Sequence, residues 1–327
     1  MRYLDLPTAK SWSAIGLGTW QFGSREWGYG RDYAGADGEA GRIVARALEL
    51  GVTVFDTAEA YGFGRSERIL GEALDRADAD PETTVVATKI FPVLPIDQVV
   101  VQRGTSSAAR LRRRIDLYQV HQPNPVIGDG TTMAGMRTLQ AAGVIGEVGV
   151  SNYSLDRWQG AETALGTQVV SDQVQYSLVA RDPDRDLLPY ARTAGRAILA
   201  YSPLAQGFLS GRYDADHRPA NRVRSLNPLF LPESLRRATP LIETLREVAD
   251  AHDATPSQVA LAWTIHHPVV CAIPGASSVA QLESNCAAAE IRLGDDEYDA
   301  LTAAAERFEP VRGFSAVAGI ARAQLGA

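Results

Sequence analysis

The sequence contains little cysteine and no long apolar run. Only Cys271 and Cys286 occur among its 327 residues, and neither stands in a CxxC or zinc-ligand pattern. This argues against a disulfide framework or a cysteine-based metal site, and it makes a reducing cytoplasm the expected location. No window approaches the ~18 apolar residues of a membrane-spanning helix, and the N-terminus lacks the apolar core of a signal peptide. The sequence therefore predicts a soluble intracellular protein.

An excess of positive charge is also absent. The formal net charge is −7 and the isoelectric point is near 5.3, which argues against nucleic acid or an anionic membrane as a main partner. The apolar share of 45% and the charged share of 22% are typical of a globular protein with an ample core. We find no change of composition along the chain, so we expect one domain over residues 1–327, as a monomer or small homo-oligomer.

Lysine is the rarest charged residue. Only Lys10 and Lys89 are lysines among the 32 basic residues, so the chain uses arginine almost everywhere. Lys89 ends an apolar segment, Thr84–Lys89, where a compact ammonium can fit better than a planar guanidinium. Chance or an ordinary ion pair would also explain this lysine, but its position at the end of a strand favours a functional role.

Polar residues follow several segments that are typical of buried strands. Val52–Phe55 leads into Asp56, and Tyr61 stands five residues later in a turn closed by Gly62. In the same way, Ile115–Val120 leads into His121. A buried carboxylate needs a partner, because an unpaired charge there costs several kcal/mol or must be neutralised. We therefore expect Asp56, Tyr61, Lys89 and His121 to form one catalytic constellation.

Strands and helices alternate along the chain after a hairpin at residues 2–14. The expected strands cover 15–19, 52–55, 84–89, 115–121, 148–152, 169–176, 197–202 and 269–273. The expected helices cover 37–50, 66–74, 106–113, 131–142, 155–164, 184–194, 233–252, 256–266 and 279–288. Long loops are expected at 20–35 and 203–232, and a further helix at 295–308. This alternation predicts an α/β fold, a (β/α)8 TIM barrel with an N-terminal β-hairpin and an extra C-terminal helix, whose site lies at the carboxyl ends of the strands.

Several motifs together resemble the aldo-keto reductase superfamily, in the branch of potassium-channel β-subunits and bacterial aldo/keto reductases. They occur in the family's order, at residues 16–20, 55–62, 66–71, 115–121, 149–152, 200–207 and 273–278. The resemblance implies a (β/α)8 barrel that reduces carbonyl compounds with a nicotinamide cofactor and has no Rossmann domain. In agreement, no GxGxxG turn opens a βαβ unit.

The tetrad then has a chemical interpretation. Reduction of a carbonyl leaves an alkoxide, and tyrosine, with a reference pKa of ~10, is a weak acid to protonate it. We assign Tyr61 as the general acid, Lys89 as the cation that lowers the phenol pKa, and Asp56 as the anchor of Lys89. His121 would hold and polarise the substrate carbonyl. Each residue alone could be structural, as a core ion pair or a buried histidine, but the four together favour catalysis.

The resemblance also implies a set of cofactor-binding residues. Ser151, Asn152 and Gln173 match the residues that bind the carboxamide, and Tyr201 would stack on the nicotinamide ring. The remaining matches lie at the end of the strand at 15–19 and the start of the loop after it, and in segments that would bind the pyrophosphate and the adenosine end. They are Gly18, Thr19, Trp20, Ser202, Pro203, Leu204, Gln206, Gly275, Ser277, Gln281 and Asn285.

One departure from the family concerns the 2′-phosphate of NADPH. Many members have a lysine where this chain has Gly275, and an arginine where it has Gln281. In the branch that the segment resembles, basic residues of the long loop contribute instead, and Arg212 and Arg222 are the matching residues, with Arg222 ranked first. We expect NADPH (NADP+) as the cofactor, while NADH use remains open.

The substrate and two rival functions complete the expectations. Trp20 and Trp27, together with Tyr61 and His121, predict a small apolar or aromatic carbonyl substrate, although loop tryptophans often only pack a loop down. One rival is a Schiff-base aldolase that uses Lys89. The other is a non-catalytic or weakly catalytic redox sensor or partner subunit that binds the nicotinamide cofactor.

Overall fold

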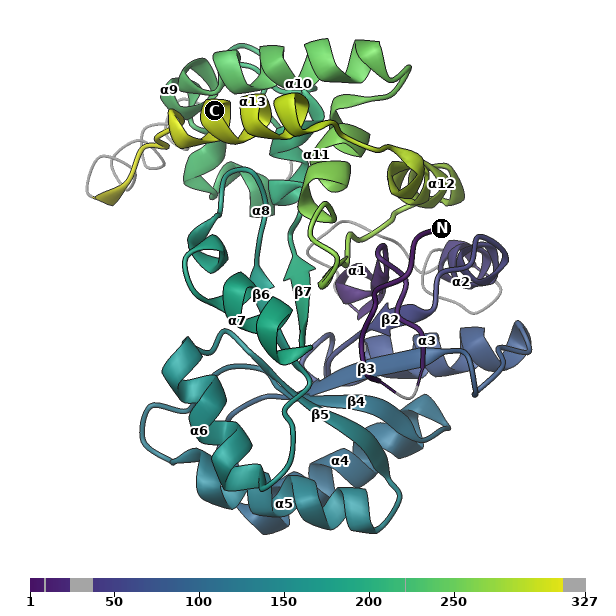
Figure 1. The fold of residues 1–327 in the computed structure, drawn as a ribbon. Helices are drawn as coiled ribbons and strands as arrows, with labels where there is room; N and C mark the ends of the chain where they lie inside the picture. Colours follow the sequence, from purple (N-terminus) through teal and green to yellow (C-terminus); the bar gives the residue numbers. More distant parts are fainter. Residues whose placement is uncertain (9, 24–37, 221, 314–327) are drawn as a thin grey trace.

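A computed structural model gives the fold of the chain and describes all residues except 9, 24–37, 221 and 314–327 (Figure 1). The strands form one parallel sheet in which each strand pairs with the next along the sequence, from β1 to β8. They are β1 (Leu17–Gly18), β2 (Val54–Asp56), β3 (Val85–Ile90), β4 (Ile115–Val120), β5 (Ile145–Ser151), β6 (Ser171–Gln175), β7 (Ala197–Tyr201) and β8 (Val270–Ala272).

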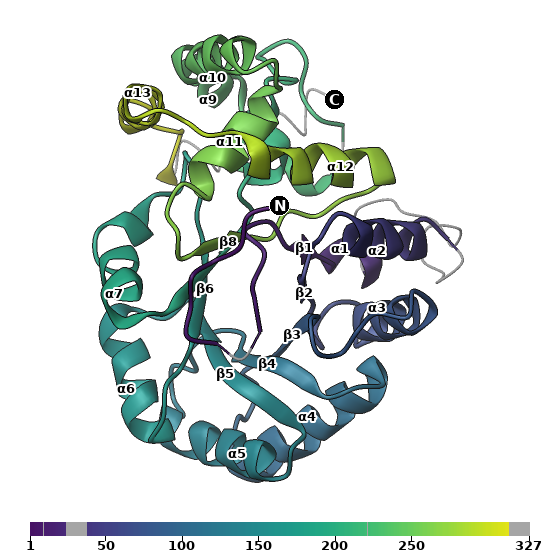
Figure 2. The same ribbon diagram turned by 45° about the vertical axis from the view of Figure 1, so that its right-hand side comes forward.

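Helices follow the strands and surround the sheet (Figure 2). They are α1 (Trp20–Gly23), α2 (Glu39–Glu49), α3 (Arg65–Arg76), α4 (Asp97–Leu111), α5 (Asp129–Ala141), α6 (Leu155–Leu165), α7 (Leu187–Ala194), α8 (Arg222–Ser225), α9 (Pro232–Arg237), α10 (Thr239–Ala251), α11 (Pro256–Thr264), α12 (Val279–Ala287) and α13 (Asp295–Glu306). None of the helices in the described part of the chain has the length and apolar character needed to span a membrane.

The sheet closes on itself, which confirms the predicted (β/α)8 barrel. Parallel bridges join Ile15 to Ala272 and Gly18 to Gly275, and they connect the first strand region to the last. A side chain at Gly18 would place its Cβ 2.7 Å from the carbonyl oxygen of Ile273, so glycine permits this close approach. Closure brings the carboxyl ends of all the strands to one mouth.

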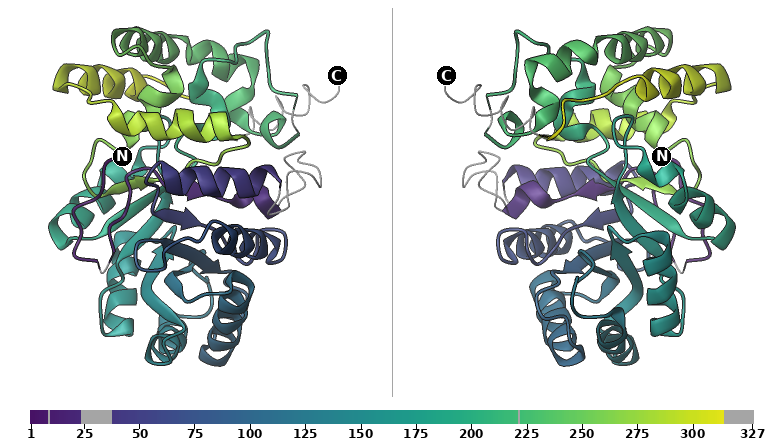
Figure 3. Two further views of the ribbon diagram at one scale, coloured as in Figure 1. Left: turned by 90° about the vertical axis from the view of Figure 1, so that its right-hand side faces the viewer. Right: turned by 90° about the vertical axis from the view of Figure 1, so that its left-hand side faces the viewer.

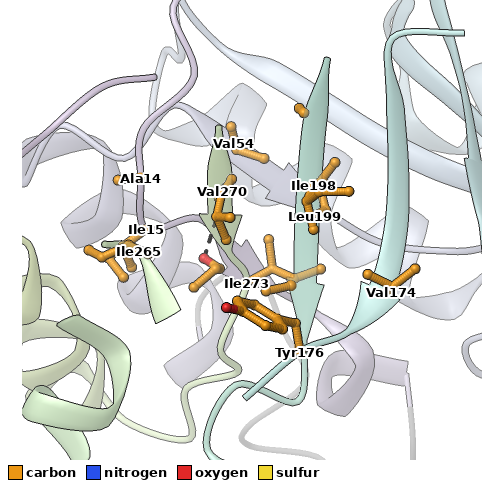
Figure 4. Close-up of a cluster of buried hydrophobic side chains, with 14 of the residues drawn as sticks. Ala14, Ile15, Val54, Val174, Tyr176, Ile198, Leu199, Ile265, Val270 and Ile273 are labelled. Atoms are coloured by element: carbon orange, nitrogen blue, oxygen red, sulfur yellow. Dashed lines mark hydrogen bonds between the residues drawn. The ribbon is translucent and has the colours of Figure 1, made fainter. Parts of the chain in front are cut away.

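The barrel core is built from β-branched and aliphatic side chains. Every residue of β3 is buried, and Ile198 of β7 lies opposite Val270 of β8 in the sheet register. Figure 4 shows one buried cluster, to which β7, β8 and the segment before β1 contribute. The surrounding helices bury apolar faces against the sheet, as the periodicity of the sequence requires.

The N-terminal segment forms the expected hairpin. Tyr3 and Ser13 pair in an antiparallel bridge, and the Leu4 N–H donates to the carbonyl of Trp12. Lys10 donates to the carbonyl oxygen of Thr84 at 2.9 Å and pairs with Asp116 at 2.5 Å, near the amino ends of β3 and β4. Lys10 therefore has a structural role, at the end of the barrel opposite the mouth.

Two expected helices have different bounds in the structure. The helix expected at 106–113 is α4 and begins at Asp97, although Val99–Val101 is a β-branched run. Tertiary packing outweighs this weak preference, because α4 crosses its neighbours closely at Gly104. The helix expected at 233–252 is two helices, α9 and α10, because Pro240 cannot supply the N–H that a continuous helix needs.

Two expected loops contain short helices. The segment 20–35 begins with α1, and the rest of it lies outside the described residues. The segment 203–232 contains α8 and two 3-10 turns, Ala205–Ser210 and Pro228–Phe230. Helices α9 to α13, green to yellow in Figure 3, gather on one side of the barrel.

Candidate active site

Three strand ends and one turn bring the predicted tetrad together. Asp56 is the last residue of β2, Lys89 lies near the end of β3, and His121 directly follows β4. Tyr61 stands in the turn between β2 and α3. The neighbouring Gly62 has φ of +61°, and a side chain there would clash with the carbonyl oxygen of Gly23. The turn therefore packs against the backbone of α1, which fixes the place of Tyr61.

Lys89 is fully buried and makes three contacts with oxygen atoms. Its Nζ donates to Asp56 Oδ2 at 2.7 Å, to the carbonyl oxygen of Thr57 at 2.8 Å and to Tyr61 Oη at 3.4 Å. Burial alone would lower the pKa of Lys89, but Asp56 and Tyr61 outweigh burial and raise it above the ordinary value. The side chain is therefore an ammonium at neutral pH.

The phenol of Tyr61 lies between a buried cation and the cavity. Burial raises its pKa, the charge of Lys89 lowers it, and the charge of Asp56 raises it, with a net rise above the ordinary value. Lys89 thus lowers the phenol pKa as expected, through its charge and its hydrogen bond, but burial outweighs this effect and the net pKa is raised. The phenol remains protonated at neutral pH and is available as a proton donor.

The ring of His121 lies edge-on to two aromatic rings. Its centroid is 5.8 Å from that of Tyr61 and 5.7 Å from that of Phe91, with interplanar angles of 86° and 84°. Burial, and then the charge of Lys89, lower the pKa of His121 to about 3. Its buried Nδ1 has no hydrogen-bond partner among the described residues. A neutral imidazole with an unused polar atom can take part in binding a carbonyl compound.

Asp56 has a second set of partners on its other oxygen. The amide of Gln173 donates to Asp56 Oδ1 at 2.8 Å, and the amide of Gln119 approaches the same oxygen at 3.4 Å. Gln119 was missed from the sequence. It stands two residues before His121 on β4, and strand alternation could have revealed that both side chains point into the barrel.

The residues predicted to bind a carboxamide lie side by side. Asn152 follows β5 with φ of +60°, and its amide donates to Ser151 Oγ at 3.0 Å. The hydroxyl of Tyr201 donates to Asn152 Oδ1 at 3.0 Å, and Ser151 Oγ donates to the carbonyl oxygen of Gln173 at 2.7 Å. These contacts join β5, β6 and β7 at the mouth of the barrel.

The loop after β7 has an unusual backbone. Ser202, Ala205 and Gln206 all have φ between +47° and +59°, the left-handed region that side chains disfavour. Arg224 Nε donates to the carbonyl oxygen of Gln206 at 2.9 Å and holds this loop from α8. Arg224 was missed from the sequence, which gave no signal to separate it from Arg222. The side chain of Arg222 lies outside the described residues.

Most of the predicted site residues line one cavity of about 1560 Å³. Tyr61, Asp56 and His121 line it, whereas Lys89 lies behind them. Trp20 also lines it, with its ring 6.2 Å from that of Tyr61, and Trp27 falls outside the described residues. The other predicted binding residues on its wall are Gly18, Thr19, Ser151, Asn152, Gln173, Tyr201, Ser202, Pro203, Leu204, Gln206, Arg212, Gly275, Ser277, Gln281 and Asn285.

The far wall of the cavity is rich in polar groups. Gln281 Oε1 accepts from both the N–H and the hydroxyl of Ser277 at 2.8 Å, and Asn285 donates to the carbonyl oxygen of Gly275 at 3.3 Å. Arg212 and Arg224 line the same cavity. Within the described residues there is no group of three or more His, Cys, Asp or Glu side chains that could hold a metal ion.

Comparison with known proteins identifies the family. Residues 14–306 match the model described as "Aldo/keto reductase family". The chain belongs to the aldo/keto reductase family. This confirms the resemblance, and it places the protein among the oxidoreductases that act on carbonyl compounds.

Individual relatives support the assignment over nearly the whole chain. An uncharacterized oxidoreductase of Mycobacterium tuberculosis (strain ATCC 25618 / H37Rv) is 57% identical over 312 residues, which cover 95% of each chain. The methylglyoxal reductase YeaE of Escherichia coli (strain K12) is 33% identical over 290 residues, covering 87% of this chain and 88% of the relative. A crystal structure of an aldo-keto reductase from Klebsiella pneumoniae in complex with NADPH superposes on this chain with a TM-score of 0.73 at 27% sequence identity. The match covers 96% of this chain and 98% of that structure's chain.

Proposed function

We propose that this protein reduces an aldehyde or ketone to the corresponding alcohol with NADPH. The observation that carries the proposal is the arrangement at the mouth of the barrel. A fully buried ammonium, Lys89, lies between Asp56 and Tyr61, while Tyr61 and His121 line a cavity of about 1560 Å³. The cofactor supplies the hydride when it is bound, and the chain supplies the proton and the electrostatics.

Tyr61 is the proposed proton donor to the oxygen of the reduced carbonyl. Its phenol is protonated at neutral pH because burial keeps its pKa high, and Lys89 stabilises the phenolate that forms when the proton leaves. Asp56 holds the ammonium in place at 2.7 Å. His121 is neutral and stands beside Tyr61, so it can donate or accept a hydrogen bond at the carbonyl oxygen without adding charge.

The cavity wall fits an elongated dinucleotide. Amide and hydroxyl groups gather near the tetrad at Ser151, Asn152 and Gln173, where a carboxamide can exchange hydrogen bonds. Tyr201 lines the same region and would stack on the nicotinamide ring. The loop after β7 would follow the pyrophosphate, and Gly275, Ser277, Gln281 and Asn285 would hold the adenosine end.

Arginine side chains support NADPH over NADH. With Gly275 and Gln281 in place of a lysine and an arginine, a 2′-phosphate needs donors from another segment. Arg212 lines the cavity, and Arg222 begins α8 beside the cavity residue Arg224. A guanidinium binds phosphate through charge-assisted hydrogen bonds, often two at once.

Neither rival function has comparable support. A Schiff-base aldolase needs a neutral amine that faces the substrate, but the pKa of Lys89 is raised and its side chain lies behind the cavity wall. A non-catalytic sensor would not need an acid, a buried cation and a neutral histidine in contact. The complete tetrad therefore favours an enzyme.

The test is to titrate the purified protein with NADPH and NADH by cofactor fluorescence, and then to follow reduced-cofactor consumption with carbonyl compounds. Methylglyoxal is a sensible first substrate because the E. coli relative is named for it, and 4-nitrobenzaldehyde is a suitable aromatic one. We expect saturable binding, tighter for NADPH, and consumption that depends on the carbonyl. Cofactor binding with no consumption across a panel of aldehydes and ketones would contradict the proposal.

A further inference from the structure

Glu59 stands two residues before Tyr61, and every polar group of this residue forms a hydrogen bond. Its N–H donates to the carbonyl oxygen of Lys89 at 3.3 Å, and its own carbonyl oxygen accepts from the Gly64 N–H at 2.7 Å. Its side chain does not line the cavity and is only 10% exposed. The residue thus connects the tyrosine turn to the strand that carries Lys89.

The carboxylate of Glu59 joins this turn to the loop after β3. One oxygen accepts from the Phe91 N–H at 2.5 Å. Arg103 of α4 binds both oxygens, with Nε 3.0 Å from Oε2 and Nη2 bonded to Oε1, and its Nη1 donates to the carbonyl oxygen of Val93 at 3.1 Å. The pair therefore binds two loops at once.

The two loops joined in this way carry the rings that enclose His121. Tyr61 comes from the first loop and Phe91 from the second, and each ring meets the imidazole edge-on. The contact of Tyr61 Oη with Lys89 Nζ is 3.4 Å, near the limit of a hydrogen bond. A small movement of the turn would break this contact, and a misplacement of about 1 Å can cost ~10²-fold in rate.

We propose that Glu59 and Arg103 are positioning residues, which hold the Tyr61 turn against Lys89 and the Phe91 loop against His121. This inference rests on the proposed function, since it assigns a role in proton transfer to a pair that touches neither substrate nor cofactor. The bidentate geometry matters more than the charge, because only a planar fork reaches both carboxylate oxygens and a backbone carbonyl together.

A matched control lies at the opposite end of the barrel. Glu162 Oε1 accepts from the backbone N–H of Val169 at 3.1 Å and twice from Arg196, at 3.0 and 2.8 Å, while Oε2 accepts from the hydroxyl of Tyr190. The Glu162 side chain is 17% exposed and that of Arg196 is 9% exposed, so this is also a largely buried carboxylate–guanidinium pair, although Arg196 binds one carboxylate oxygen and Arg103 binds two. It holds the start of β7 and contacts none of the tetrad.

The experiment compares Glu59→Gln, Arg103→Met and Glu162→Gln with the wild type, using NADPH and 4-nitrobenzaldehyde. We expect Glu59→Gln and Arg103→Met each to lower kcat by about 10- to 100-fold, with the NADPH dissociation constant within about threefold. The double variant should lose little more than either single one, because the two residues act as a unit. Glu162→Gln should lower the Tm and leave kcat within about twofold, since it also weakens a largely buried carboxylate–arginine pair but one that lies away from the tetrad.

Hydrogen exchange followed by mass spectrometry gives a second readout that needs no turnover. Peptides covering residues 57–64 and 90–96 should exchange faster in Glu59→Gln and Arg103→Met, and not in Glu162→Gln. Folded variants that keep kcat within about twofold of the wild type would overturn the inference, and so would unchanged exchange in both peptides. A wild type without any turnover would instead refute the proposed function, and the exchange data would still decide the role of the pair.

Discussion

Replacement of Lys89 by methionine should destabilise the protein as well as inactivate it. The side chain is fully buried, and Asp56 beside it is 2% exposed. Without the ammonium, the side-chain donors left to the carboxylate among the described residues are the amides of Gln173 and Gln119, at 2.8 and 3.4 Å. The variant therefore leaves a buried charge with weak compensation.

The size of the effect follows from this unpaired charge. Removing one partner of a buried ion pair typically costs ~3–5 kcal/mol in the free energy of unfolding. Removing both charges is often nearly neutral, because no uncompensated ion is left behind. We therefore expect Asp56→Asn/Lys89→Met to be more stable than Lys89→Met by several kcal/mol, of the order of that same penalty. Both variants should lose turnover, since neither has a cation beside Tyr61.

Urea unfolding, followed by tryptophan fluorescence and by circular dichroism without cofactor, measures these differences. Coincident transitions from the two probes would justify the comparison of free energies. A Lys89→Met variant as stable as the wild type would refute the account of the buried pair. A double variant less stable than both single ones would do the same.

Three further predictions concern the charged groups in and beside the site. Lys89→Arg should impair kcat nearly as much as Lys89→Met, because a broad fork does not fit among three closely placed oxygen atoms; an arginine variant with most of its activity would reduce Lys89 to a generic charge. Arg212→Ala and Arg222→Ala should each weaken NADPH binding by about 10- to 100-fold, a loss of ~1.5–3 kcal/mol, and should affect NADH binding much less. Equal losses for both cofactors would contradict a role at the 2′-phosphate. Asp172→Asn should stabilise the fold by about 1–3 kcal/mol near pH 8, because the carboxyl of Asp172 is fully buried and the backbone N–H groups of Tyr153 and Asn152 that approach it do not reach good hydrogen-bonding geometry. Burial raises the pKa of this carboxyl to about 8, so the stability of the wild type falls as pH rises from ~4 through that value. Thermal unfolding of the wild type and Asp172→Asn between pH 5 and 9 should therefore show a difference in Tm that widens as pH rises.

The sequence predicted the parts of the fold that depend on local patterns. Buried strands such as β3 and β4 are rich in β-branched and other apolar residues, and the polar residues near their carboxyl ends meet at one mouth because parallel strands share a direction. The tetrad could therefore be assembled from spacing and strand direction alone. Family motifs located most of the proposed binding residues, and those that are described line one cavity.

Features that depend on contacts between distant segments could not be predicted. Nothing near Glu59 indicates that Arg103, 44 positions later, will bind it. The direction of the pKa shift of Tyr61 depends on how much burial opposes Lys89, a balance that only the packed structure gives. The start of α4 was missed for the same reason, since a β-branched run is helical there only because of its tertiary neighbours.

Replacement of Tyr61 by phenylalanine tests the central claim most directly. The variant removes the hydroxyl that contacts Lys89 at 3.4 Å and leaves the ring beside His121 and Trp20. General acid catalysis typically contributes ~10²–10⁴-fold, so kcat for an aldehyde should fall by that factor. The NADPH dissociation constant, measured by fluorescence on the same preparation, should stay within about fivefold, since a ring-conserving change removes no proposed cofactor contact. A folded Tyr61→Phe protein with near wild-type turnover would contradict the assignment of Tyr61 as the proton donor.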